Sequence, residues 1–210
     1  NNLLLTFDDG YLSDYEVAKN ILNPMGIPAL FFVITKLLKL KSGQDQRKFI
    51  ATQLYPDWLD MQIPDDKKEL KSMDKKHIQF LIESGHEIGF HTKSHQRLSK
   101  INNEELLIDE IINGANELEN ILDIKIKHFA YTFGDINSFS KEAMKIAKSK
   151  FDFIYTGLRG NNRFSLNPFS IRRDYIDINF SNNIVKSLLL GAGDFIYKND
   201  LEVVDSWTKS

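Results

Sequence analysis

Short, continuously apolar runs alternate with helix-like segments along this chain of 210 residues. Residues 3–7 and 29–35 are apolar at nearly every position, and a third strand-like run spans 86–92. Strands that are apolar throughout are expected where both faces of a sheet are covered, as in parallel sheets. Helix-like segments separate these runs, at 13–22 and 74–84. The alternation predicts a parallel α/β architecture, either an open sheet or a barrel.

Local signals mark where several of these elements begin. Ser13 and Glu16 have the spacing of a capping box, and Asp74 is expected to cap the helix that follows it. The longest helical pattern has apolar residues at 107, 111, 115, 118 and 122. In the rest of the chain the pattern predicts helices at 102–122, 140–149 and 183–190 and strands at 124–131, 151–157 and 170–178.

Residues 36–73 interrupt this alternation. They carry two prolines and mixed charge, with Tyr55 and Trp58 in the middle. We interpret them as an insertion after the second strand of a single domain that spans residues 1–210. An insertion of this length could form a lid over a site, or a solvated excursion packed by its own aromatic residues. Both interpretations stay open.

The composition limits the classes of function. The net charge is -2 and the isoelectric point about 6.2, which argues against a basic nucleic-acid-binding surface. The chain has no cysteine, so disulfides and thiol catalysis are excluded. No apolar stretch approaches the roughly 18 residues of a membrane span, and no signal peptide is visible. Bacterial cytoplasm and cell envelope both stay open, and the oligomeric state is not indicated.

Two predicted strand ends carry the residues with the clearest chemistry. Asp8 and Asp9 end the first strand, followed by Gly10, and His91 and His95 follow the third. In parallel α/β folds, functional residues collect where strands end. Two histidines four residues apart lie on one side of a helical turn, and with one carboxylate they form a metal site with open positions. Each pattern alone is more often a surface pair or a solvated turn, but together they favour a metal site.

A divalent metal would explain the adjacent carboxylates. It lowers the pKa of bound water toward 7, and a second carboxylate can then take the proton of that water. In an extended segment Asp8 and Asp9 would point to opposite faces, so one can bind the metal while the other faces the water. Gly10 would let the backbone turn sharply and leave room for substrate.

With their neighbours, these residues resemble a known family. "TFDDG" at 6–10 and "GHEIGFHTKSH" at 85–95 resemble the first two motifs of the polysaccharide deacetylase family, also called the NodB-homology or carbohydrate esterase 4 family. "GIPALFFV" at 26–33 is similar to its second strand, and "FAYTFGD" at 129–135 resembles its third motif. The resemblance covers residues 3–135 well. It implies a distorted (β/α) barrel of the NodB type.

The resemblance also implies an activity and a set of roles. The expected enzyme is a hydrolase that removes acetyl groups from sugars, with Zn²⁺ or another divalent transition metal as cofactor. Water bound to the metal would attack the acetamide carbonyl, with Asp8 as general base. A backbone N–H near Tyr131 to Phe133 would bind the developing oxyanion, and Gly10 would leave space for the substrate. The metal ligands would be Asp9, His91 and His95.

The chain departs from the family pattern in its third motif and its C-terminal third. The arginine and proline that often stand in the third motif are missing, so Arg172 or Arg173 is expected to supply the charge near Asp8. The family often has a late histidine that acts as general acid, but none follows His128. Another group, or Asp8 itself, would have to protonate the leaving amine. His86 and His128 are expected to be packed residues rather than ligands.

The expected partner is a carbohydrate with N-acetyl groups. Chitin fragments, peptidoglycan, biofilm polymers, O-antigen or capsule precursors and acetylated xylan all stay open, although the C-terminal third resembles deacetylases of surface-polysaccharide synthesis more. One alternative is a non-catalytic sugar-binding homologue that retains the metal. Another is an Fe(II) oxygenase, because two histidines and one carboxylate also form that triad. The oxygenase would leave the second aspartate unexplained.

Overall fold

The computed structural model of the protein describes residues 3–55, 71–162, 166–177 and 179–209. The chain divides into two compact units, which we describe separately. The first unit consists of Asn1–Gln96 and Ile108–Ile126, and the second of Arg97–Leu107 and Lys127–Ser210.

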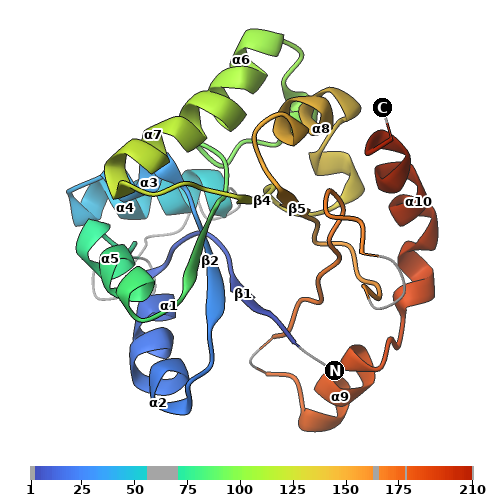
Figure 1. Ribbon diagram of the computed structural model, residues 1–210, viewed down its shortest axis with the longest axis horizontal. Coiled ribbons are helices and arrows are strands. Elements are labelled where there is room, and N and C mark those ends of the chain that lie inside the picture. Colours follow the sequence, from blue (N-terminus) through green and yellow to red (C-terminus); the bar gives the residue numbers. More distant parts are fainter. Residues whose placement is uncertain (1–2, 56–70, 163–165, 178, 210) are drawn as a thin grey trace. The chain divides into compact units, whose positions relative to one another are not determined.

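Three parallel strands form the sheet of the first unit (Figure 1). They pair in the order β1 (Leu5–Phe7), β2 (Ala29–Val33) and β3 (Glu87–Phe90), with Leu5 opposite Ala29 and Leu30 opposite Glu87. Every residue of β2 is buried, as its continuous apolar sequence predicted. The first three predicted strands are therefore confirmed, although each is shorter than its apolar run.

The predicted helices of the first unit are present, but π-helical turns interrupt two of them. The predicted capping box at Ser13 is wrong, because the helix begins directly after Tyr11, which provides no side-chain cap. The Asp74 cap is confirmed, since its carboxylate accepts from the N–H of His77 at 3.0 Å. The elements are α1 (Leu12–Val17), the π-helix η1 (Ala18–Leu22), α2 (Asn23–Met25), α5 (Lys75–Glu83), the π-helix η6 (Asp109–Asn113) and α7 (Gly114–Leu122). The helix α6 (Glu104–Ile108) belongs to the second unit except for Ile108.

The predicted insertion at 36–73 begins as three short helical segments. These are α3 (Thr35–Lys39), α4 (Gly43–Phe49) and the π-helix η2 (Ile50–Leu54). Residues 56–70, including Trp58, lie outside the described part of the chain. The described segments share an apolar cluster with the end of β2, so this part of the insertion is packed onto the first unit. The cluster contains Ile34, Leu37, Phe49, Ile50 and Leu54, with Tyr11 and Leu40 packed against it.

The second unit has two parallel strands, β4 (His128–Ala130) and β5 (Phe153–Tyr155). The strand predicted at 170–178 is wrong for the described residues there, because only Ile171 bridges to Tyr155. A C-terminal helix that the sequence did not predict packs beside α8 (Figure 1). Within the described residues, no helix has both the length and the apolar character needed to cross a bilayer. The helical elements are η5 (Leu98–Lys100), η7 (Ile136–Ser138), α8 (Lys141–Lys148), α9 (Asn182–Leu189), η8 (Asp194–Tyr197) and α10 (Lys198–Trp207).

Candidate metal centre

A sharp turn directly after β1 positions the first ligand. Asp9 and Gly10 both have left-handed backbone, with φ of +73° and +81°. The sequence predicted an extended segment through Asp8 and Asp9. This prediction is wrong, because the chain turns at Asp9. A Cβ on Gly10 would meet Val33 at an ordinary 3.6 Å. The glycine is needed for the positive φ more than for space.

The two histidines lie on a tight loop that follows β3. The N–H of His91 donates to the carbonyl of Val33 at 2.9 Å, which continues the pairing of β3 with β2. The chain then becomes left-handed at Thr92 (φ +64°) and at His95 (φ +61°). The Thr92 hydroxyl accepts from the N–H of His95 at 2.8 Å and closes the loop. As a result, both imidazoles face the turn that carries Asp9.

Asp9, His91 and His95 converge on one point. The Nε2 atoms of both imidazoles lie 3.4 Å from Oδ1 of Asp9, and the potential ligand atoms are all within 4.8 Å of one another. This buried Oδ1 makes no hydrogen bond within normal geometry to any described residue. A buried carboxylate oxygen without a hydrogen bond is costly unless a cation binds it. Two imidazoles and one carboxylate therefore fit a divalent transition metal.

The electrostatics of the triad keep Asp9 ionised. Burial alone would raise the pKa of its carboxyl group, but the His91 and His95 imidazoles beside it outweigh burial and hold that pKa well below its usual range. A metal ligand must be deprotonated to bind. At neutral pH Asp9 is thus already in the form that a cation requires.

The pKa of Asp14, in the first turn of α1, is shifted in the opposite direction from that of Asp9. Burial first, and then the charge of Asp9, raise the pKa of its carboxyl group to about 7. Its folded-state pKa lies above its unfolded value, so its favourable contribution to folding is complete below pH 4 and is lost as the pH rises through 7.

Without added metal, we expect Asp14→Asn to be more stable than wild type above pH 7, with the difference disappearing toward pH 4. Urea unfolding at pH 4, 7 and 8.5 measures this, and a difference independent of pH would contradict it.

Backbone strain marks the same segments. Five described residues other than glycine have left-handed φ, and four of them lie in the three motifs that the sequence singled out. Such conformations cost about 1–3 kcal/mol each and persist where surrounding structure holds them, often at functional sites. The fifth, Asp123, ends helix α7 in the usual left-handed manner. The four are Asp9, Thr92, His95 and Phe133.

The other predicted site residues are not tested by this geometry. Asp8 is partly buried between β1 and the Asp9 turn. Tyr131, in the second unit, is fully buried, and its hydroxyl donates to the carbonyl of Gly134 at 3.1 Å. Their proposed roles stay predictions.

The remaining two candidates also lie in the second unit. Phe133 is 39% exposed, and the guanidinium carbon of Arg97 lies 3.9 Å from the centroid of its ring. The guanidinium of Arg172 donates to Asp205 at 3.2 Å and to the carbonyl of Asn161 at 2.8 Å. These contacts show how the two side chains are held within the unit, and their roles toward substrate stay predictions.

Two further histidines are packed residues, as predicted. Nδ1 of His86 accepts from the N–H of Ala29 at 3.1 Å, and its Nε2 lies 2.7 Å from Oδ1 of Asn23. Nδ1 of His128 lies 2.9 Å from the hydroxyl of Tyr155. Both ring nitrogens of His86 and Nδ1 of His128 thus have structural partners.

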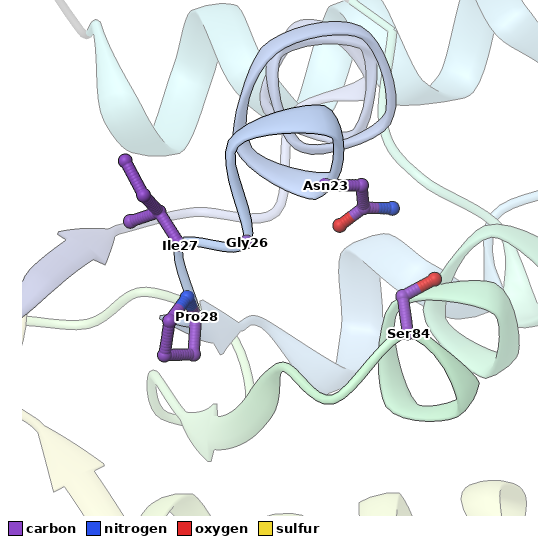
Figure 2. A pocket seen from close by; sticks show the side chains of 5 residues that line it. All are labelled: Asn23, Gly26, Ile27, Pro28 and Ser84. Carbon is purple, nitrogen blue, oxygen red and sulfur yellow. The ribbon is translucent and has the colours of Figure 1, made fainter.

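A separate hollow of about 360 Å³ lies at the opposite end of β2 from the ligands (Figure 2). Figure 2 shows Asn23 and Ser84 at two helix ends beside it, with the other lining residues on the loop that leads into β2. None of its lining residues is titratable, so this hollow offers no catalytic group. They are Asn23, Gly26, Ile27, Pro28 and Ser84.

Gly114, at the start of α7, allows the histidine loop to approach the helix closely. A Cβ there would lie 2.6 Å from Cβ and 3.0 Å from Cα of Lys93. Alanine would gain about 1 kcal/mol of helix propensity, but these contacts involve atoms that cannot move aside, and overpacking costs about 1–3 kcal/mol. We expect Gly114→Ala to lower the free energy of unfolding, measured in urea. Gly43→Ala is the control, because its Cβ would meet only Arg47 Nη1, at 3.7 Å; equal effects would contradict the prediction.

Comparisons with known proteins support the family resemblance that the sequence motifs indicated. A family model described as polysaccharide deacetylase matches residues 1–151. A search of curated proteins found no significant match. Among solved structures, the chain is similar to the Streptococcus pyogenes deacetylase PplD in complex with acetate, with 20% identity, coverage of 88% of this chain and 69% of that one, and a TM-score of 0.68.

Two further structures are similar over most of the chain. IcaB from Ammonifex degensii is 21% identical, with coverage of 91% of this chain and 71% of that one and a TM-score of 0.62. A polysaccharide deacetylase from Bacillus cereus is 18% identical, with coverage of 89% and 50% and a TM-score of 0.63. These likenesses confirm the predicted fold class, a distorted (β/α) barrel of the NodB type.

Proposed function

Because the chain belongs to the polysaccharide deacetylase family, we propose that it hydrolyses the N-acetyl groups of a carbohydrate with the help of a divalent metal. The observation that carries this proposal is the convergence of Asp9, His91 and His95 around a buried carboxylate oxygen without a hydrogen bond. These three side chains would hold Zn²⁺ or another divalent transition metal. When bound there, such a cation would lower the pKa of water and polarise an acyl oxygen.

Asp8 is the proposed general base. It precedes the ligand Asp9 directly, and the left-handed turn at Asp9 gives the two carboxylates different directions. Asp8 would accept a proton from the attacking water, while Asp9 stays ionised beside the imidazoles. Backbone N–H groups between Tyr131 and Phe133 are the proposed donors to the developing oxyanion. Arg172 is proposed, from the sequence, to supply positive charge near Asp8.

The leaving amine must gain a proton before it departs. No histidine follows His128, so the late histidine common in the family is missing. The simplest route returns the proton from Asp8, which would then act first as base and second as acid. In this route the Asp8 carboxylate accepts one proton and donates one proton in each turnover.

The proposed substrate is a polysaccharide or a surface-polysaccharide precursor that carries acetamido groups. Acetate is the expected product, and it is the ligand named with the S. pyogenes deacetylase. The family match ends at residue 151. From the sequence of the C-terminal third, which lacks the late histidine, we favour an enzyme of surface-polysaccharide synthesis over one for chitin or xylan.

Acetate release tests the proposal. Wild-type protein, freed of metal and then loaded with Zn²⁺, Co²⁺ or Mn²⁺, would be incubated with N-acetylated glucosamine oligomers and with de-O-acetylated surface polysaccharide. We expect metal-dependent acetate release that Asp8→Asn lacks. Binding of the sugars without acetate release from any of them would favour the non-catalytic alternative. Oxygen consumption with Fe(II) and a 2-oxo acid would favour the oxygenase.

A further inference from the structure

Several polar contacts hold the loop that carries the ligand His95. The loop is strained, because Thr92 and His95 are both left-handed. Its closing bond, from the His95 N–H to the Thr92 hydroxyl, lies within the loop itself. Helix α3 donates backbone hydrogen bonds to the start of the loop, and two helical segments far away in the sequence contact it through Glu110 and Gln53. Strained loops of this kind persist only when surrounding structure fixes them.

Glu110 holds the middle of the loop. Its Oε2 accepts from the N–H of Ser94 at 3.0 Å, and its Oε1 accepts from the Ser94 hydroxyl. Its backbone carbonyl accepts from the N–H of Lys93 at 3.0 Å. Glu110 is only 9% exposed, so these bonds form away from water, where a charged acceptor is strong. One residue therefore fixes two consecutive peptide groups next to His95.

Gln53 fixes the His95 imidazole itself. The backbone carbonyl of Gln53 lies 3.1 Å from Nδ1 of His95. A carbonyl can only accept, so Nδ1 donates, and Nε2 is the ring nitrogen that faces Asp9 and the proposed metal position. The Gln53 side chain in turn accepts from Nε2 of Gln96 at 3.0 Å. Gln53 thus links the described part of the 36–73 insertion to His95 and to the residue after it.

Both residues belong to π-helical turns. Gln53 lies in η2 and Glu110 in η6. Single π-helical turns are rare and are frequently found at functional sites, because they displace one residue from the regular helical register. We propose that Glu110 and Gln53 are positioning residues, which hold the 91–95 loop so that the Nε2 atom of His95 is directed at the metal. This inference rests on the proposed metal-dependent function.

Metal affinity tests the proposal without relying on activity. Co²⁺ and Zn²⁺ dissociation constants would be measured by competition with a chelating dye, together with the visible spectrum of the Co²⁺ protein. Loss of residues that orient metal ligands typically weakens affinity by about 10- to 100-fold. We expect Glu110→Ala to show a loss of this size and an altered Co²⁺ spectrum. Glu110→Gln, which can accept from one Ser94 group and donate to the other, should restore most of the affinity.

Glu119→Ala is the matched control. Glu119 is 8% exposed on the adjacent helix α7, and its Oε1 also accepts a backbone N–H, that of Ile126, at 2.9 Å. Its loss should destabilise the fold by a comparable amount but leave the Co²⁺ affinity and spectrum unchanged. Gln53→Ala, which removes the link to Gln96 but keeps the carbonyl, should weaken affinity less than Glu110→Ala.

The outcomes separate this inference from the function on which it rests. A folded Glu110→Ala protein with wild-type Co²⁺ affinity and spectrum would overturn the inference, and so would equal effects of Glu110→Ala and Glu119→Ala. If Glu110→Ala does not fold, Ser94→Ala removes one of the same bonds and is expected to lower affinity by a smaller factor; wild-type affinity there would count against the proposal. A wild-type protein that binds neither cation would overturn the proposed function first.

Discussion

Replacing Asp8 by asparagine is expected to reduce kcat for deacetylation by about 100- to 10,000-fold, the range that a general base contributes. Asparagine has nearly the same shape but cannot accept the proton of the attacking water. The ligands Asp9, His91 and His95 are unchanged in this variant, so the Zn²⁺ dissociation constant should stay within about tenfold of wild type. Steady-state acetate release and competition with a chelating dye measure the two quantities on the same preparation.

The matched control for this prediction is Asp45→Asn. Asp45 is an exposed acid in the first turn of α4, so the variant removes the same charge at a distance from the triad in sequence. It should retain wild-type kcat. An Asp8→Asn enzyme with more than a tenth of wild-type kcat would show that another group takes the proton. Loss of metal binding with Asp8→Asn would instead make Asp8 a ligand.

Continuity of apolar residues explains why the first half of the fold could be predicted. The run at 29–33 has no polar residue, and a strand buried on both faces is the simplest structure that hides it. The prediction failed at 170–178, where apolar residues are mixed with charged ones. The polar side chains there have partners elsewhere in the second unit, with Arg172 bound to Asp205 and Asp174 to Arg159. A mixture of apolar and charged residues does not distinguish a strand from a segment held by ion pairs.

The C-terminal helix α10 was missed for the opposite reason. Its ten residues are mostly polar, and only Leu201 and Val204 are buried. Two apolar residues three positions apart are too few to establish a helical period. The helix is held by its packing beside α8, which a sequence pattern does not contain.

The ligands could be predicted from residue type and spacing, but the parts that hold them could not. Nothing in "TFDDG" or "HTKSH" reveals left-handed backbone at Asp9 and His95. One signal was available for Glu110, because it lies on the apolar stripe of the 102–122 helix, three residues after Leu107. An acid on a buried stripe must have a polar partner, here Ser94. Gln53 contacts His95 through its backbone carbonyl, and the type of side chain at position 53 cannot predict such a contact.

Removing one imidazole from the triad is expected to have the largest effect of all. His91→Ala and His95→Ala should each abolish detectable acetate release at micromolar Zn²⁺. They should also lose the stabilisation that the metal gives, which for wild type is about 2.7 kcal/mol when the free metal is 100 times its dissociation constant. Urea unfolding with and without Zn²⁺, and with a chelator, measures this difference.

The metal-free form provides a second and independent readout of the same variants. The imidazoles hold the pKa of Asp9 below its unfolded value, so Asp9 contributes stability above pH 4 that is lost as the pH falls further. Without one imidazole, the buried carboxylate has less compensation, and the unfolding free energy at pH 7 should fall even in chelator. His128→Ala is the control, since His128 contacts Tyr155 and is outside the ligand cluster found among the described residues. If His128→Ala and His95→Ala lost equal amounts of zinc-dependent stability, the stabilisation would not come from the triad.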